Sequence, residues 1–147
     1  MIVISEKLIS QIKAYAENSY PNECCGFIFG VMSSDVKQAA EIRAEENSFD
    51  DNEKYHRFNI SADTMMKAEL YARKNNLDIV GIYHSHPDCE AVPSEYDRKH
   101  ALPVYSYIIV SVIKGEAADV TCHELDKESG YIKFIEEQTV IYNKGEI

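Results

Sequence analysis

Two histidines separated by one residue, His84 and His86, stand where an apolar segment of the sequence ends. Side chains two positions apart on a β-strand project from the same face, roughly 7 Å apart along the backbone. Imidazoles at that spacing can converge on one zinc ion, each at about 2.0–2.1 Å. Asp97, after ten intervening residues, can supply a third, oxygen ligand. Three protein ligands with one open position are typical of catalytic zinc, whereas structural sites fill all four positions.

The same residues also have a purely structural interpretation. A histidine pair on a strand is more often just a polar face, and Ser94-x-x-Asp97 fits an acidic form of the helix capping box. The combination favours the metal. The histidines follow an apolar strand, Pro87 and Pro93 bracket the next loop, and the Ser-x-x-Asp pattern directly begins the following element.

A metal-dependent hydrolase also needs a base that takes a proton from water. Glu23 immediately precedes the apolar run 24–32, so its carboxylate is expected at the mouth of a buried strand. The alternative is that Glu23 only begins this strand in solvent, and the local sequence leaves both interpretations open.

Bulk properties limit the other function classes. The chain has 147 residues, which predicts a single domain over residues 1–147. Its net charge of −10 and its lack of a Lys/Arg cluster argue against nucleic acid and an anionic membrane surface as partners. No signal segment or transmembrane run is evident, so we expect a cytoplasmic protein whose four cysteines stay reduced.

The order of predicted elements indicates an α/β fold. Helices are expected from Ser5 to about 18, from Ser61 to about 75, and from 94 to about 102. Strands are expected at 2–4, about 24–32, 36–45, 55–60, 78–85, 105–113, 119–125 and 131–136, with an edge strand at 139–142. Crossover units mixed with hairpins predict a mixed, curved sheet flanked by helices.

Three segments together resemble the JAMM/MPN metalloprotease family, in particular its small bacterial and archaeal members. They are Pro21-x-Glu23-Cys24-Cys25-Gly26, His84-x-His86-Pro87 and Pro93-Ser94-x-x-Asp97. The resemblance implies a cytidine-deaminase-like mixed sheet with zinc held by His84, His86 and Asp97. It also implies that Glu23 deprotonates a zinc-bound water and that the Ser94 hydroxyl stabilises the tetrahedral oxyanion.

The resemblance further implies a zinc metallopeptidase or isopeptidase. Its substrate would be a peptide or isopeptide bond after the C-terminal Gly-Gly tail of a ubiquitin-like or sulfur-carrier protein. The alternative is a non-catalytic MPN-type interaction module. Such modules usually lose one or more ligands, whereas all five motif residues are present in this chain.

Several features leave alternatives open. Cys89 lies in the loop after the histidines and is either an inhibitory ligand or, as we favour, an ordinary loop thiol. The acid-rich segment 45–53 is either a contact for a basic carrier surface or, as we favour, a solvated loop. His56, His100 and His123 are interpreted as structural or exposed residues. Apolar edge strands near residues 131–142 make a homodimer an open option.

Overall fold

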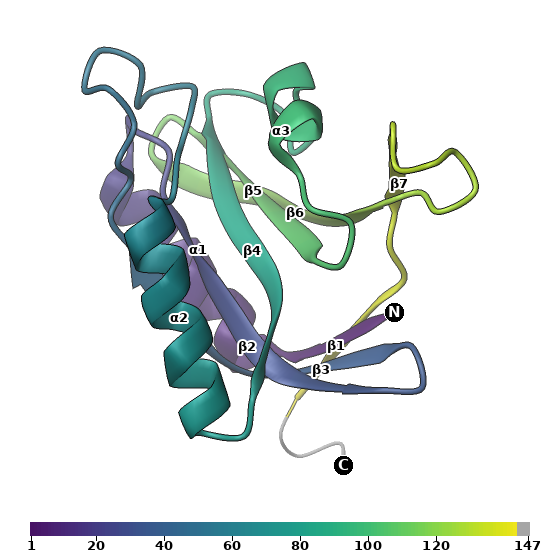
Figure 1. Ribbon diagram of the computed structural model, residues 1–147. Coiled ribbons are helices and arrows are strands. Elements are labelled where there is room, and N and C mark those ends of the chain that lie inside the picture. Colours follow the sequence, from purple (N-terminus) through teal and green to yellow (C-terminus); the bar gives the residue numbers. More distant parts are fainter. Residues whose placement is uncertain (144–147) are drawn as a thin grey trace.

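The computed structural model describes residues 1–143, in which eight strands form one mixed, curved sheet with three helices packed around it (Figure 1). The predicted mixed sheet is therefore confirmed. The strands follow the order β7-β6-β5-β4-β2-β3-β1-β8 across the sheet. They are β1 (Ile2–Ser5), β2 (Cys25–Ser33), β3 (Val36–Glu45), β4 (Asp78–Pro87), β5 (Ser106–Ile113), β6 (Glu116–Leu125), β7 (Phe134–Glu136) and β8 (Thr139–Tyr142).

The centre of the sheet brings two distant parts of the chain together. β2 pairs antiparallel with β4 so that Cys25 lies opposite His84. β4 in turn pairs parallel with β5, where His84 lies opposite Ile109. Because Glu23 lies two residues before Cys25, this register carries it to the end of β4 that holds the two histidines.

The helices begin where their capping residues predict. Ser5 caps α1 (Glu6–Ser19) and its Oγ accepts a hydrogen bond from the Leu8 amide at 3.2 Å. Ser61 caps α2 (Ala62–Lys74) in the same way, and α3 (Glu95–His100) follows Ser94. The inner face of α2 is narrow: Ala68 and Ala72 are buried, but Leu70 is exposed.

The curved sheet separates two hydrophobic cores, one on each face. The core beneath α1 is built on the helix residues Ile9, Ile12 and Ala16. The core beneath α2 is built on Ala68 and Ala72, which pack with strand residues that alternate with those of the first core. Its strand members are Phe27, Phe29, Ile82 and Tyr107.

The predicted strand over residues 55–60 is wrong. This segment is a turn followed by irregular chain. Its alternation reflects Phe58 and Ile60, which pack against the core beneath α2 without a neighbouring strand. Side-chain hydrogen bonds partly replace strand pairing, since the Asn59 amide donates to Asn47 Oδ1 at 3.1 Å.

Gly26 allows β2 and β4 to approach closely near the base of the site. A Cβ atom at this position would lie 2.4 Å from the Tyr83 ring and 2.5 Å from the carbonyl oxygen of Arg43. Only glycine leaves room for both neighbours without moving a strand.

The edges of the sheet are β7 and β8. β8 confirms the predicted edge strand and exposes Val140 and Ile141. Dimerisation through these edges stays a prediction. Over residues 1–143, no helix has the length and apolar character needed to cross a membrane.

Candidate metal centre

The end of β4 places two imidazole nitrogens and one carboxylate oxygen around a common point. His84 Nε2 and His86 Nε2 are 3.2 Å apart, and each lies 3.1 Å from Asp97 Oδ2. Ligand atoms bound to one tetrahedral zinc at about 2.0–2.1 Å would be separated by about 3.3 Å. The three atoms thus fit one face of a zinc coordination tetrahedron.

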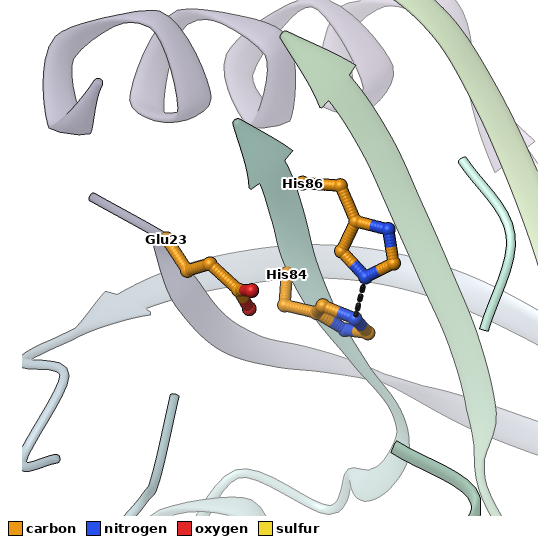
Figure 2. Close-up of side chains that lie close together, drawn as sticks. All are labelled: Glu23, His84 and His86. Carbon is orange, nitrogen blue, oxygen red and sulfur yellow. Dashed lines mark hydrogen bonds between the residues drawn. The ribbon is translucent and has the colours of Figure 1, made fainter. Parts of the chain in front are cut away.

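The local structure explains why both imidazoles reach this point. His84 and His86 are two residues apart on β4, so the pleat sends both side chains to the face that α2 covers. Both side chains are buried, at 1% and 7% exposure. Figure 2 shows the two rings turned toward one another, with the Glu23 side chain reaching toward them from the segment before β2.

Asp97 is held in place by the start of α3. Its backbone N–H donates to Ser94 Oγ at 3.0 Å, and its own Oδ2 accepts from the Ser94 amide at 2.9 Å. This is a complete capping box, so the structural interpretation of Ser94-x-x-Asp97 is correct as far as it goes. The capping box does not compete with metal binding. Asp97 Oδ2 accepts the Ser94 amide and also lies beside the two imidazoles, and a carboxylate oxygen has lone pairs for both contacts. The Ser94 hydroxyl keeps its proton available for a further acceptor.

Glu23 lies beside the two histidines (Figure 2). It is 4% exposed, and one of its carboxylate oxygens lies within 4.8 Å of ligand atoms of both histidines. Its Oε1 is buried and has no hydrogen-bond partner among the described residues. A carboxylate costs free energy when buried in this way, which is typical of a group reserved for chemistry or for a ligand. The solvated interpretation of Glu23 is therefore wrong.

The charges in the site complement one another. Burial raises the pKa of Glu23 to about 8, with His86 opposing and Asp97 reinforcing the shift. Burial also acts against ionised Asp97, but the two histidines outweigh it and hold the pKa of this carboxyl well below its usual range. The pKa of His84 is lowered by burial, which favours the neutral imidazole that a metal requires. For His86, burial is outweighed by hydrogen bonds to Asp97 and the Glu90 carbonyl, and its pKa rises.

The outer surroundings of the two imidazoles differ. His86 Nδ1 lies 2.9 Å from the Glu90 carbonyl oxygen, a contact that orients a metal-binding histidine. The His84 ring instead stacks on Phe58, with ring centroids 4.6 Å apart and planes inclined by 23°. His84 Nδ1 is buried and has no hydrogen-bond partner within residues 1–143.

Two positioning residues escaped the sequence analysis. Ser85 Oγ accepts a buried hydrogen bond from the Cys24 amide at 2.8 Å, and so ties the segment after Glu23 to the histidine strand. Asn47 Nδ2 donates to the carbonyls of Glu23, at 3.2 Å, and Arg57, at 2.9 Å. Asn47 therefore joins the loop that carries Phe58 to the segment that carries Glu23. In the sequence, only the position of Asn47 before a turn-rich segment points to this role.

The remaining histidines and thiols lie outside the cluster. His100 is exposed and stacks on Tyr96, and His123 lies against Phe134. Cys89 is exposed, and the described structure does not place it among the grouped ligand atoms. Cys24 and Cys25 are both buried, and burial raises the pKa of Cys24 to about 11. These two thiols therefore pack as small apolar side chains.

Comparison with known proteins places this geometry in a wider context. The family model described as prokaryotic homologs of the JAB domain matches residues 5–125. A desampylase from Pyrococcus furiosus is 33% identical over 97 residues, which are 66% of this chain. The match spans 63% of that relative's length, which is less than two thirds.

Solved structures show the same architecture. A protein from Desulfitobacterium hafniense has a TM-score of 0.82 at 24% identity, over 98% of this chain and 94% of its own. A JAB1/MPN domain protein from Archaeoglobus fulgidus has a TM-score of 0.55 at 18% identity, over 97% of each chain. These likenesses concern the fold, and they confirm the expected JAMM/MPN-type sheet.

Proposed function

The chain belongs to the family of prokaryotic homologs of the JAB domain, and from this premise we propose that it is a zinc-dependent peptidase or isopeptidase. The proposed reaction is hydrolysis of the bond that follows the Gly-Gly tail of a ubiquitin-like or sulfur-carrier protein. The observation that carries the proposal is the triangle of His84, His86 and Asp97 ligand atoms beside buried Glu23.

Each residue of the site has a distinct role in this proposal. His84, His86 and Asp97 would hold the zinc ion. When bound, zinc lowers the pKa of a water molecule toward about 7 and polarises the scissile carbonyl. Glu23 takes a proton from the attacking water and passes it to the leaving amine as the C–N bond breaks. The glycine carbonyl carbon gains the water oxygen, and the tail is released with a C-terminal carboxylate.

Ser94 supports the same reaction through its free hydroxyl proton. Ser94 Oγ already accepts a hydrogen bond from the Asp97 backbone N–H, so the capping box orients the hydroxyl. The hydroxyl proton can still be donated. Donation to the carbonyl oxygen as negative charge develops could accelerate the reaction by about 10²–10³. The same serine thus caps α3 and would stabilise the transition state.

A glycine tail suits this site for steric reasons. Only glycine residues let an extended backbone approach a metal within a narrow groove without a side-chain clash. The desampylase likeness and the family membership support a protein tail as substrate, as the sequence resemblance implied. The acid-rich loop 45–53 contacts the Glu23 backbone through Asn47, and its negative charge could attract a basic carrier surface.

Metal content and cleavage test the proposal together. Purified protein should contain about one zinc per chain, and the His84→Ala/His86→Ala variant should contain none. The substrate is a sulfur-carrier protein of the ubiquitin fold, extended by a short peptide after Gly-Gly and followed by mass spectrometry. Glu23→Gln should retain zinc and lose cleavage by at least about 10²-fold, because the proton acceptor is missing.

The outcomes separate the proposed enzyme from its alternative. Zinc retained by the double histidine variant would contradict the metal assignment. Cleavage by Glu23→Gln at the wild-type rate would exclude this residue as the base. A zinc-loaded wild-type protein that binds the carrier without cleaving it would instead identify a non-catalytic interaction module.

A further inference from the structure

A pocket of about 230 Å³ opens directly beside the candidate metal ligands, between α2 and α3. His84 and Asp97 form part of its wall, so it is continuous with the metal centre. The pocket is smaller than the roughly 300–1,000 Å³ that encloses a whole drug-sized ligand, and its size suits one side chain. Its apolar walls are Phe58, Ile60, Met65, Ile82, Leu102 and Tyr107.

We propose that this pocket binds a large apolar side chain of the residue that follows the scissile bond. The inference rests on the proposed function, because it assumes that glycines precede this bond. Those glycines have no side chain that could occupy the pocket. A pocket whose wall includes two candidate ligands must receive a group next to the reacting carbonyl. Because the glycines are excluded, the side chain that enters the pocket belongs to the first residue of the leaving group.

The chemistry of the lining selects the occupant. Besides Asp97 and His84, which face the metal, the remaining polar members of the wall are Asn59, Tyr96 and His100. Asn59 and Tyr96 offer no charge opposite to that of a carboxylate or a lysine, and His100 Nδ1 already lies 2.9 Å from the Tyr96 carbonyl oxygen. A charged occupant would therefore lose hydration without a dedicated partner. Met65 and the aromatic rings of Phe58 and Tyr107 favour methionine, leucine or phenylalanine.

The glycine tail has a separate approach. A second hollow of about 550 Å³ borders Ser94 on the other side of α3. Its lining includes Val92, Pro93, Ser94, Arg98, His123 and Phe134. The two hollows therefore flank α3, with Ser94 on the side that would receive the tail and Asp97 on the side that would receive the leaving residue.

A substrate series tests the pocket with the unmodified enzyme. The same sulfur-carrier protein is extended after Gly-Gly by a single residue, either Met, Phe, Ala or Asp, and also by a lysine joined through its ε-amine. Met and Phe extensions should have kcat/KM values at least about tenfold above Ala and Asp, since even one methylene in an apolar pocket is worth roughly tenfold or more. An ε-linked lysine should be no better than Ala.

A pair of neighbouring methionines provides the matched variants. Met65 lines the pocket, whereas Met66 is 54% exposed and does not. Met65→Trp should fill the pocket and lower the ratio of kcat/KM for the Met extension to kcat/KM for the Ala extension at least about tenfold. Met66→Trp should leave both values unchanged. The wild-type series decides the question even if Met65→Trp fails to fold.

Failure of this inference is distinguishable from failure of the proposed function. If none of the extended carriers is cleaved by the zinc-loaded protein, the proposed peptidase function is wrong, and the pocket assignment falls with it. If all extensions are cleaved at similar rates, the function stands and the pocket assignment is overturned. Preference for the ε-linked lysine would also overturn it, because the pocket would then receive the lysine methylenes.

Discussion

Two clusters of buried polar groups lie toward opposite ends of the central strands, and only one of them is complete in itself. The first is the candidate metal centre at the end of β4. The second, here the ionic cluster, consists of Lys37, Ser106 and Glu137. Ser106 pairs with Gly81 on β4, five residues before His86, and is in phase with the residues of the core beneath α1. The two clusters therefore occupy different ends and different faces of the sheet.

The ionic cluster satisfies its own groups. Lys37 Nζ donates to Ser106 Oγ at 2.8 Å and lies 3.4 Å from Glu137 Oε2. Ser106 Oγ donates in turn to Glu137 Oε1 at 2.5 Å, and Glu124 lies 3.6 Å from the ammonium group. Buried charges are tolerated when they are paired and hydrogen-bonded in this way. This cluster has the character of a structural element that joins β3, β5 and the chain after β7.

The candidate metal centre lacks this internal pairing. Glu23 Oε1 and His84 Nδ1 are buried without partners among the described residues. Three acceptor-type atoms of His84, His86 and Asp97 crowd within 3.2 Å of one another. Such crowding is unfavourable unless a cation or protons join the atoms. Burial of charged groups alone therefore does not indicate function. Buried polar groups that lack partners do indicate it.

Disruption of the ionic cluster should have the largest effect on folding. Lys37→Met removes one of the two cations beside the fully buried carboxylate of Glu137 and leaves the N-terminal ammonium of Met1, 3.2 Å from Oε2, as the other. We expect a loss of up to about 3–5 kcal/mol in the free energy of unfolding, measured by urea denaturation. Zinc content and cleavage by the folded fraction should be unchanged, because no member of this cluster contacts the metal centre.

A second variant and a control sharpen this result. The double variant Lys37→Met/Glu137→Met removes both charges and should recover much of the lost stability, as apolar replacements of buried pairs often do. Lys67→Met removes a pair that is largely exposed, with Lys67 Nζ 2.9 Å from Asp63, and should change stability little. A double variant that is less stable than the single one would indicate that the cluster does more than balance its own charge.

The candidate metal centre should show the opposite behaviour when Glu23 is neutralised. Burial raises the pKa of Glu23 to about 8 from an ordinary value of 4.5. Between these pH values the folded metal-free protein holds a proton that the unfolded chain has released, so stability falls as the pH rises. We expect metal-free wild-type protein to lose on the order of 2–3 kcal/mol between pH 5 and pH 8.

Glu23→Gln should remove this component of the pH dependence and make the metal-free protein more stable at pH 8. Urea denaturation in the presence of a chelator at pH 5, 6.5 and 8 measures the effect. Glu128→Gln changes an exposed carboxylate and serves as the control. A glutamine variant less stable than wild type at pH 8 would show that the carboxylate is satisfied in the folded chain, and the contrast between the two clusters would then disappear.

The residues that come from local patterns were predictable from the sequence. The spacing of His84 and His86 fixes their common face, and Ser5, Ser61 and Ser94 each begin a helix. These features depend on strand pleat and on capping, which act over two to four residues.

The residues that escaped prediction act over long sequence distances. Asn47 reaches the Glu23 carbonyl across 24 positions, and Ser85 reaches the Cys24 amide across 61. The ionic cluster spans 100 positions between Lys37 and Glu137. A single polar residue has no periodic pattern in the sequence from which such a long-range contact could be predicted. The alternation over residues 55–60 wrongly predicts a strand for the same reason, because the hydrogen-bond partners of this segment are the Asn47 side chain and the Ser48 backbone and not another strand.

Two buried serines allow the smallest and most specific test of the comparison. Ser85 Oγ accepts from the Cys24 amide at 2.8 Å, so Ser85→Ala leaves that buried donor unpaired beside the base. We expect a loss of about 1–2 kcal/mol in the free energy of unfolding and a fall in kcat. Zinc content should be unchanged, because the lost hydrogen bond holds the segment that carries Glu23 and does not hold the candidate zinc ligands. Ser106→Ala removes a hydroxyl that is equally buried from the ionic cluster, and it should reduce stability while kcat stays at the wild-type value. Urea denaturation and cleavage of the extended carrier measure both variants. Equal kcat values would mean that Ser85 only holds two strands together, and the positioning role assigned to it would have to be abandoned.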